Sequence, residues 1–213
     1  MHFSSIERQQ RIKGDNMEQL PIRRALLSAT DKTGLADLGR FLTECGVELV
    51  STGGTYKTLA EAGLEVTAVS EVTGFPEVLG GRVKTLHPHI HAGILADKDN
   101  PEHHNSLEEL GIAPFDLVCV NLYDFAGALE RGLSDQELVE EIDIGGPTLL
   151  RAAAKNYHSL AVLPDPSFYS RFQSELRDSE GGIGLAFRKE LAAYTFSMIS
   201  RYDRLIAEGL QGS

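Results

Sequence analysis

The sequence has no hydrophobic run that reaches the roughly 18 residues of a membrane-spanning helix, and its beginning lacks the apolar core of a signal peptide. These absences argue against a membrane partner and predict a cytoplasmic protein. Cysteine is scarce, with only Cys45 and Cys119 in 213 residues and no C-x-x-C spacing. Because both lie among apolar neighbours, we expect two buried thiols and neither a disulfide nor a cysteine-based metal site.

Positive charge is also in short supply. The chain has 20 Lys and Arg against 31 Asp and Glu, a formal net charge of -11. Such a chain is repelled by a phosphate backbone, so no nucleic-acid partner is expected, and a local group of cations instead indicates a small anionic ligand. The hydrophobic content of 42% and charged content of 24% are ordinary for a globular protein, and the length suits a single domain.

Two nucleotide-binding signatures are missing. Neither the P-loop pattern G-x-x-x-x-G-K nor the dinucleotide pattern G-x-G-x-x-G occurs, which disfavours nucleoside triphosphates and dinucleotides as ligands. The sequence also has no repeat of roughly 20 to 50 residues and no low-complexity linker, so a second domain is not predicted.

Short apolar runs alternate with amphipathic stretches along the chain. Strands are expected at 24–28, 47–50, 66–69, 117–122 and 160–163, and helices at about 35–45, 56–62, 101–110, 134–141, 148–156 and 191–205. This alternation predicts an α/β, doubly wound fold with a mainly parallel sheet, whose ligands collect at the carboxyl ends of the strands. We divide the chain into a mobile arm (1–20), one domain (21–208) and a tail or linker remnant (209–213).

Three loops rich in glycine and hydroxyl side chains, 28–34, 51–55 and 143–148, follow predicted strands or open predicted helices. A strand-to-helix turn offers backbone N–H groups and the positive end of a helix dipole, which together bind phosphate. Each loop alone is typical of an ordinary turn, whereas a pair on adjoining strand ends favours a phosphate cradle.

The segment 79–88, LGGRVKTLHP, carries the densest set of ligand-type residues. Its two glycines free the backbone, and Arg82 and Lys84 stand two apart, so an extended segment would project both cations to one side. That pattern predicts an anion site, with an ordinary solvated loop as the alternative.

His87, His89 and His91 alternate just beyond these cations. In an extended segment they would share one side, which is a weak indication of a zinc site. On the predicted helix 148–156, Lys155 follows three alanines that allow close packing, so its ammonium group is a candidate for desolvation and acid–base work; a surface helix bearing Arg151 and Lys155 is the alternative.

Six motifs occur along the chain in one order: 31–34 (DKTG), 51–55 (STGGT), 80–88 (GGRVKTLHP), 121–123 (NLY), 142–146 (IDIGG) and 151–156 (RAAAKN). Together they resemble the inosine-monophosphate cyclohydrolase domain, the N-terminal half of the bifunctional purine-biosynthesis enzyme that also carries an aminoimidazole-carboxamide-ribotide formyltransferase. The resemblance covers about residues 25–205. It implies a methylglyoxal-synthase-like fold and a cytoplasmic enzyme whose partners are a ribonucleotide substrate, a second copy in a homodimer, and a formyltransferase domain or subunit elsewhere.

The implied reaction closes 5-formamido-1-(5-phospho-ribosyl)imidazole-4-carboxamide to inosine monophosphate with loss of water, without a metal ion or organic cofactor. The implied catalytic set is Lys84, Tyr123, Asp143 and Lys155, for which we expect Lys155 to donate and accept protons while Lys84 polarises the substrate. The implied phosphate contacts are Ser28, Thr30, Asp31, Lys32, Thr33, Thr52, Gly53, Gly54 and Thr55. The implied base and ribose contacts are Arg82, Val83, Thr85, His87, Asn121, Ile144, Gly145 and Gly146.

One residue departs from the family pattern. Asp124 stands where the family commonly has proline, so we expect a looser loop or a shifted proton affinity nearby. Taken without the resemblance, Asp143 is either a helix-entry carboxylate or a proton-transfer group, and Tyr123 is either a core residue or a functional one. Three other functions compete: methylglyoxal synthase on the same fold, a non-catalytic nucleotide sensor, and a zinc hydrolase built on the histidines.

Overall fold

The computed structural model describes residues 18–179 and 181–212. Its main sheet has the strand order β4-β3-β2-β5-β6, and every neighbouring pair is parallel. The strands are β2 (Arg24–Ser28), β3 (Glu48–Ser51), β4 (Thr67–Ala68), β5 (Leu117–Val120) and β6 (Ala161–Leu163). The predicted α/β fold with a mainly parallel sheet is therefore confirmed.

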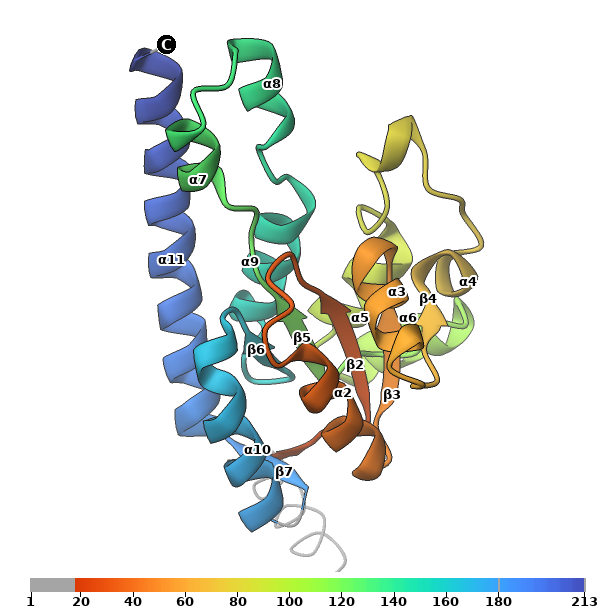
Figure 1. Ribbon diagram of the computed structural model, residues 1–213. Coiled ribbons are helices and arrows are strands. Elements are labelled where there is room, and N and C mark those ends of the chain that lie inside the picture. The colour runs from red at the N-terminus through yellow and green to blue at the C-terminus, as the bar shows by residue number, and fades with distance from the viewer. Residues whose placement is uncertain (1–17, 180, 213) are drawn as a thin grey trace, which may run out of the picture.

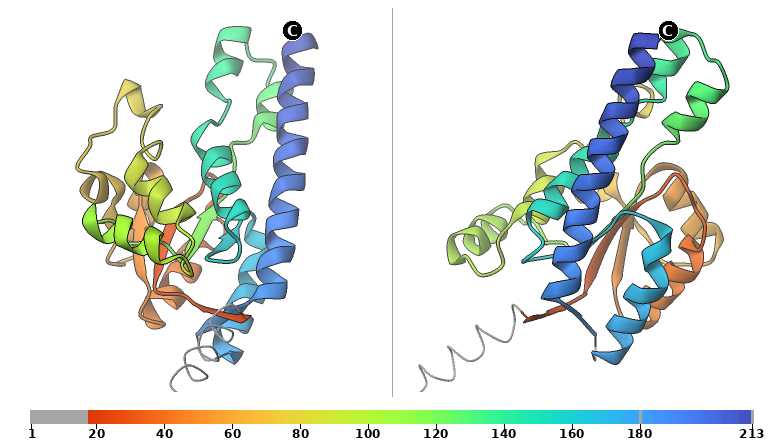
Figure 2. Two further views of the ribbon diagram at one scale, coloured as in Figure 1. Left: turned by 180° about the vertical axis from the view of Figure 1, so that it is seen from behind. Right: turned by 90° about the vertical axis from the view of Figure 1, so that its left-hand side faces the viewer.

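Helices cover both faces of this sheet. The helices of the described residues are α2 (Leu35–Glu44), α3 (Gly53–Glu61), α4 (Val69–Thr73), α5 (Pro88–Leu95), α6 (Pro101–Glu109), α7 (Phe125–Glu130), α8 (Asp135–Glu140), α9 (Gly145–Lys155), α10 (Tyr169–Asp178) and α11 (Leu185–Gly212), with short 3-10 turns η1 (Leu79–Gly81) and η2 (Pro166–Phe168). Of these, α7 and α8 lie beyond the end of the sheet (Figure 1). Figure 2 shows α9 and α11 on one side of the sheet and α2 and α10 on the other. The apolar central strands are buried between these layers, as continuous hydrophobic runs in a parallel sheet require.

The strand order reverses between β2 and β5. From β2 the chain winds outward through β3 to β4, whereas β5 and β6 lie on the other side of β2. At such a switch point the loops after neighbouring strands diverge and leave a crevice at the carboxyl edge of the sheet. The loops after β2, β3 and β5 therefore meet where ligands are expected.

The N-terminal boundary differs from the prediction. Residues 1–17 of the expected mobile arm lie outside the described residues, but β1 (Gln19–Pro21) pairs antiparallel with β7 (Gly182–Gly184), and Leu20 is only 5% exposed. The apolar side chain of Leu20 joins the main core, so residues 19 and 20 belong to the folded unit.

The C-terminal helix is longer than its apolar stripe indicated. Helix α11 has 28 residues, takes in residues 209–212 of the expected tail, and runs beside α7 (Figure 1). There Tyr202 joins Phe125, Ala128 and Leu138 in a small second core. Helices α4, α7 and α10 also form where no helix was predicted.

The histidine segment is helical instead of extended. Pro88 suits the first turn of α5, and His87 caps that helix by accepting a hydrogen bond from the backbone N–H of His89 at 3.2 Å. Residues two apart on a helix differ by about 200° in direction, so His89 and His91 do not share a side. The geometric premise of the zinc hypothesis is wrong, and the described part of the chain has no group of three His, Cys, Asp or Glu placed to hold a metal ion.

One cysteine also differs from expectation. Cys119 is buried in β5, but Cys45 is exposed at the end of α2, so only one of the two predicted buried thiols is buried. Burial raises the pKa of the Cys119 thiol to about 12, which makes it unreactive. Among residues 18–179 and 181–212, no helix is long and apolar enough to cross a membrane.

Candidate active site

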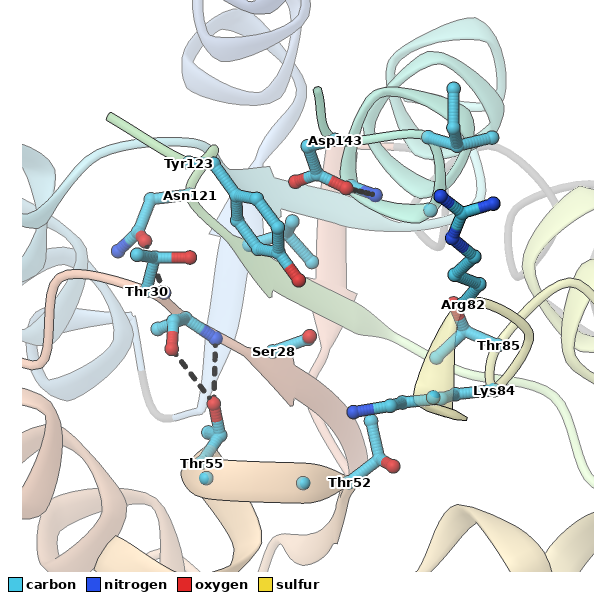
Figure 3. A pocket seen from close by; sticks show the side chains of 18 of the residues that line it. Ser28, Thr30, Thr52, Thr55, Arg82, Lys84, Thr85, Asn121, Tyr123 and Asp143 are labelled. Atoms are coloured by element: carbon cyan, nitrogen blue, oxygen red, sulfur yellow. Dashed lines mark hydrogen bonds between the residues drawn. The ribbon is translucent and has the colours of Figure 1, made fainter. Parts of the chain in front are cut away.

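A cavity of about 630 Å³ opens at the carboxyl edge of the sheet (Figure 3), within the size range of small-molecule sites. It is lined by residues from the loops after β2, β3 and β5, from the η1 segment and from the start of α9. The predicted site residues that line it are Ser28, Thr30, Lys32, Thr52, Gly53, Gly54, Thr55, Arg82, Lys84, Thr85, Asn121, Tyr123, Asp143, Ile144, Gly145 and Gly146. Those that lie outside the lining are Asp31, Thr33, Val83, His87 and Lys155.

One end of the cavity has the geometry of an anion site. Helix α3 begins at Gly53, so its first N–H groups face the cavity. A Cβ placed on Gly53 would lie 3.2 Å from the Nζ of Lys84, and one on Gly54 would lie 3.7 Å from the Nζ of Lys32. Two ammonium groups thus approach the positive end of one helix dipole, an arrangement that an anionic ligand would stabilise.

The β2 loop is tied to this helix. The Oγ1 of Thr55 accepts a hydrogen bond from the backbone N–H of Ala29 at 2.9 Å and donates to the carbonyl of Ala29 at 2.9 Å. Thr55 is 4% exposed, so both bonds are shielded from water. The two glycine-rich loops predicted as a cradle therefore form one rigid surface.

Asn121 closes the switch point between β2 and β5. Its Oδ1 accepts from the backbone N–H of Thr30 at 2.6 Å and of Asp31 at 2.9 Å, and its Nδ2 donates to the carbonyl of Asp31 at 2.8 Å. The side chain is thus used to brace the β2 loop. Asp31 itself turns away from the cavity and accepts from the backbone N–H of Thr33 at 2.9 Å, and hydrogen bonding to Thr33 lowers the pKa of this carboxyl.

Arg82 and Lys84, which follow η1, point in different directions, because the backbone of residues 79–82 forms a turn and not the predicted extended strand. Lys84 lies 3.4 Å from Glu77 Oε2, and Glu77 Oε1 accepts from the hydroxyl of Thr52 at 2.7 Å, so this carboxylate holds Lys84 beside the cradle. Arg82 reaches the opposite end of the cavity, where its Nε donates to Glu140 of α8 at 3.2 Å. Figure 3 shows the two side chains diverging.

Sequence reasoning missed both carboxylates. Glu77 is seven residues before Lys84, and an acidic residue so close to a predicted cation cluster was a usable local signal. Glu140 is 58 residues from Arg82, and nothing in the local pattern of α8 indicates this ion pair.

The other end of the cavity carries Asp143. Its Oδ1 accepts from the backbone N–H of Gly146 at 2.8 Å, and the N–H groups of Tyr123 and Gly145 also stabilise the carboxylate. Burial outweighs these bonds and raises the pKa of Asp143 above its ordinary value. A Cβ on Gly146 would overlap the Oδ2 of Asp143, so glycine is required there.

Tyr123 lines the cavity instead of the core. It is 44% exposed, and Figure 3 shows its hydroxyl pointing into the cavity towards Ser28. The neighbouring Asp124 has a structural role, because its Oδ1 caps α7 by accepting from the backbone N–H of Gly127 at 3.0 Å. The expectation of a loosened loop is therefore wrong, since this carboxylate starts a helix.

Lys155 lies far from these groups. It is the last residue of α9, whose first residue Gly145 is at the cavity, and ten helical steps span roughly 15 Å. Its side chain is exposed, and the expected desolvation is wrong. Val83 forms an antiparallel β-bridge with Val78. His87 caps α5, and its pKa is lowered mainly by burial and also by the nearby charge of His89.

Known proteins share both the sequence and the fold of this chain. A family model described as MGS-like domain matches residues 34–148, and one described as AICARFT/IMPCHase bienzyme matches residues 153–213. The "Bifunctional purine biosynthesis protein PurH" of Mycobacterium marinum (strain ATCC BAA-535 / M) is 55% identical over 193 residues, which is 91% of this chain and 36% of that protein. The protein of the same name from Mycobacterium leprae (strain Br4923) is 51% identical over 198 residues, 93% of this chain and 37% of the other.

A solved structure matches over nearly its whole length. The "Crystal structure of ForH" aligns with a TM-score of 0.79 and 34% identity, covering 89% of this chain and 97% of that one. By contrast, the chain spans little more than a third of the length of the curated relatives it matches. These matches confirm the resemblance and the fold that the six motifs predicted.

Proposed function

The chain belongs to the MGS-like domain family, and on this premise we propose that it is an inosine-monophosphate cyclohydrolase. The reaction is the closure of 5-formamido-1-(5-phospho-ribosyl)imidazole-4-carboxamide to inosine monophosphate with loss of water. The names of the relatives, purine biosynthesis proteins, and of the second family model, which includes IMPCHase, support this substrate class. The observation that carries the proposal is one cavity with a cationic helix N-terminus at one end and Asp143 with Tyr123 at the other.

The cradle holds the 5'-phosphate of the substrate. The N–H groups at the start of α3 and the ammonium group of Lys32 bind its oxygens, with hydroxyl groups of Thr30 and Thr52 beside them. Anchoring the phosphate at this end directs the imidazole ring towards Tyr123 and Asp143. The phosphate binding energy then serves to orient the two reacting groups.

Ring closure joins the carboxamide nitrogen to the formyl carbon. A C–N bond forms as the formyl C=O becomes an oxyanion, the nitrogen loses a proton, and the resulting hydroxyl leaves as water with a second nitrogen-bound proton. The carboxylate of Asp143 accepts the nitrogen proton, and the hydroxyl of Tyr123 donates to the oxygen. We assign polarisation of the formyl group to Lys84, which requires its side chain to leave Glu77 at the cradle end and extend along the cavity when substrate is bound.

Lys155 has no step in this mechanism, because it lies on the surface at the far end of α9. Proton transfer is assigned to Asp143 and Tyr123 in its place. The proposal covers ring closure alone and leaves formylation to a formyltransferase domain or subunit elsewhere. Cytoplasmic location and homodimer formation are part of the same proposal.

Ultraviolet absorbance tests the function directly. Purified chain mixed with the formylated carboxamide ribotide should convert it to inosine monophosphate, and Lys84→Ala should lose most of this activity while remaining folded by circular dichroism. A folded wild-type chain that binds the ribotide without converting it would overturn the proposal in favour of a nucleotide sensor.

A methylglyoxal synthase is the second candidate on this fold, and the cavity disfavours it. A triose phosphate would fit the cradle, but no histidine lines the cavity in the described part of the chain. Formation of methylglyoxal from dihydroxyacetone phosphate, with no conversion of the ribotide, would reverse this assignment.

A further inference from the structure

Helix α11 reaches the active site through one side chain. The backbone N–H of Asp143 donates a hydrogen bond to the hydroxyl of Tyr202 at 2.9 Å, across 59 residues of sequence. Tyr202 is 8% exposed, so this bond is largely shielded from water. The phenol of Tyr202 thus holds the main chain of Asp143, the proposed base.

The same ring also touches the segment that carries Tyr123. Tyr202 and Phe125 pack edge to face, with ring centroids 6.4 Å apart and planes at 75°. The backbone N–H of Phe125 donates to the carbonyl of Tyr123 at 3.0 Å, so the position of Phe125 sets the turn from which Tyr123 projects. One side chain therefore contacts Asp143 directly and is linked to Tyr123 through Phe125.

We propose that Tyr202 is a positioning residue for the ring closure, holding Asp143 through its hydroxyl and the Tyr123 turn through its ring. The inference rests on the proposed function. It adds a residue that lines no part of the cavity and that none of the six motifs contains.

The three N–H groups that stabilise the Asp143 carboxylate explain why its backbone must be held. The donors at Tyr123, Gly145 and Gly146 belong to two separate segments, so they converge only when residue 143 sits at one place between them. If Asp143 N–H lost its acceptor, it would be a partly buried donor without a partner, and the segment would shift to reach water. The carboxylate would then leave the geometry needed for proton transfer.

The hydroxyl of Tyr202 is neutral at neutral pH. Burial raises its pKa to about 12, although the hydrogen bond from the backbone N–H of Asp143 acts in the opposite direction, and the charges of Asp143 and Asp203 raise it further. The phenol oxygen therefore accepts from the amide of Asp143 without adding a negative charge beside the Asp143 carboxylate.

Tyr202→Phe removes the hydroxyl and keeps the ring, so it tests the hydrogen bond to Asp143 alone. We expect kcat to fall about tenfold with KM changed less than about threefold, because the phosphate cradle lies at the other end of the cavity. Amide exchange of Asp143, followed by nuclear magnetic resonance, should speed up roughly fivefold as its N–H loses the acceptor. Tyr202→Leu, which also removes the ring contact with Phe125, should lower kcat further.

Tyr194→Phe is the matched control on the same helix. Tyr194 packs edge to face on Phe168 with centroids 4.8 Å apart, away from Asp143, so loss of its hydroxyl should leave kcat and Asp143 exchange unchanged. Wild-type kcat in Tyr202→Phe, or equal losses in both variants, would overturn the positioning role. An inactive wild-type chain would overturn the proposed function but not the hydrogen bond between Tyr202 and Asp143. Unchanged amide exchange of Asp143 in Tyr202→Phe would overturn the role of that hydrogen bond, whether or not the chain is active.

Discussion

The two ends of the cavity are built in different ways. At the proposed phosphate end, the loops after β2 and β3 are held to the sheet by short-range backbone geometry and by buried bonds such as that between Thr55 and Ala29. At the acid–base end, Asp143 sits on a loop fixed by Tyr202 of α11, and Arg82 meets Glu140 of α8. The first end depends on the sheet, whereas the second depends on helices that pack beyond it.

This difference predicts a division of labour. A cradle made from strand ends is rigid before the ligand arrives, so its residues should contribute mainly to substrate binding and hence to KM. The helix-supported end carries the groups proposed to move protons, so changes there should act mainly on kcat. Variants at each end can therefore confirm or break the comparison.

Asp143→Asn should have the largest effect. An amide keeps an oxygen for the N–H of Gly146 but cannot accept a proton, so we expect kcat to fall by about a hundredfold or more with KM nearly unchanged. A large rise in KM with kcat retained would show that Asp143 binds substrate and does not transfer protons.

Asp143→Asn should lower activity but raise the stability of the folded chain. The folded-state pKa of Asp143 is raised by burial, so above the ordinary pKa of an aspartate the folded chain carries a penalty that the unfolded chain does not. Asp143→Asn removes this penalty and should raise the free energy of unfolding at pH 7. In urea titrations the gain should disappear below about pH 3.5, where the carboxyl is protonated in both states.

Gly146→Ala should rank next. The added Cβ would overlap the Oδ2 of Asp143, so either the carboxylate or the start of α9 must move. We expect kcat to fall about thirtyfold, since a shift of about 1 Å costs up to a hundredfold in rate. Gly212→Ala, where nothing lies within 4 Å of the added Cβ, is the control and should match the wild type in kinetic assays.

Lys32→Ala tests the other end. Losing one charged donor to the phosphate should raise KM about thirtyfold with kcat within about threefold, which corresponds to roughly 2 kcal/mol for a charge-assisted bond. Lys57→Ala is the control, because Lys57 lies on α3 with its side chain 76% exposed and pairs at 3.8 Å with Glu61. A fall in kcat without a change in KM in Lys32→Ala would break the comparison.

Glu140→Gln should have the smallest effect. Its ion pair with Arg82 lines the cavity and is exposed, and such pairs contribute at most about 1 kcal/mol. We expect KM to change by less than about fivefold. A rise in KM would show that Glu140 orients Arg82 towards substrate, and a fall would show that Glu140 holds Arg82 away from substrate. Glu141→Gln, which loses a comparable surface pair with Arg131, should have no effect on KM in the same assay.

Much of the phosphate end could be predicted from local patterns. The glycines of 51–55 after an apolar run indicated a strand-to-helix turn, and the turn forms where expected, with α3 beginning at Gly53.

The capping pair Ser134 and Glu137 likewise marked the start of α8. The extended conformation expected for 79–91 was wrong, because Pro88 is as suitable for the first turn of a helix as for a stiff loop.

The sequence by itself determined the five strands of the main sheet, most of the helices, and the glycine and hydroxyl loops at the strand ends, because hydrophobic period and the backbone freedom of glycine act between near neighbours. Tertiary structure alone decided that Tyr202 holds Asp143, that Arg82 meets Glu140, and that Lys155 faces outward. Each of these outcomes depends on how α8, α9 and α11 pack against the sheet and against one another. The two contacts join residues more than fifty positions apart, and no local pattern encodes them.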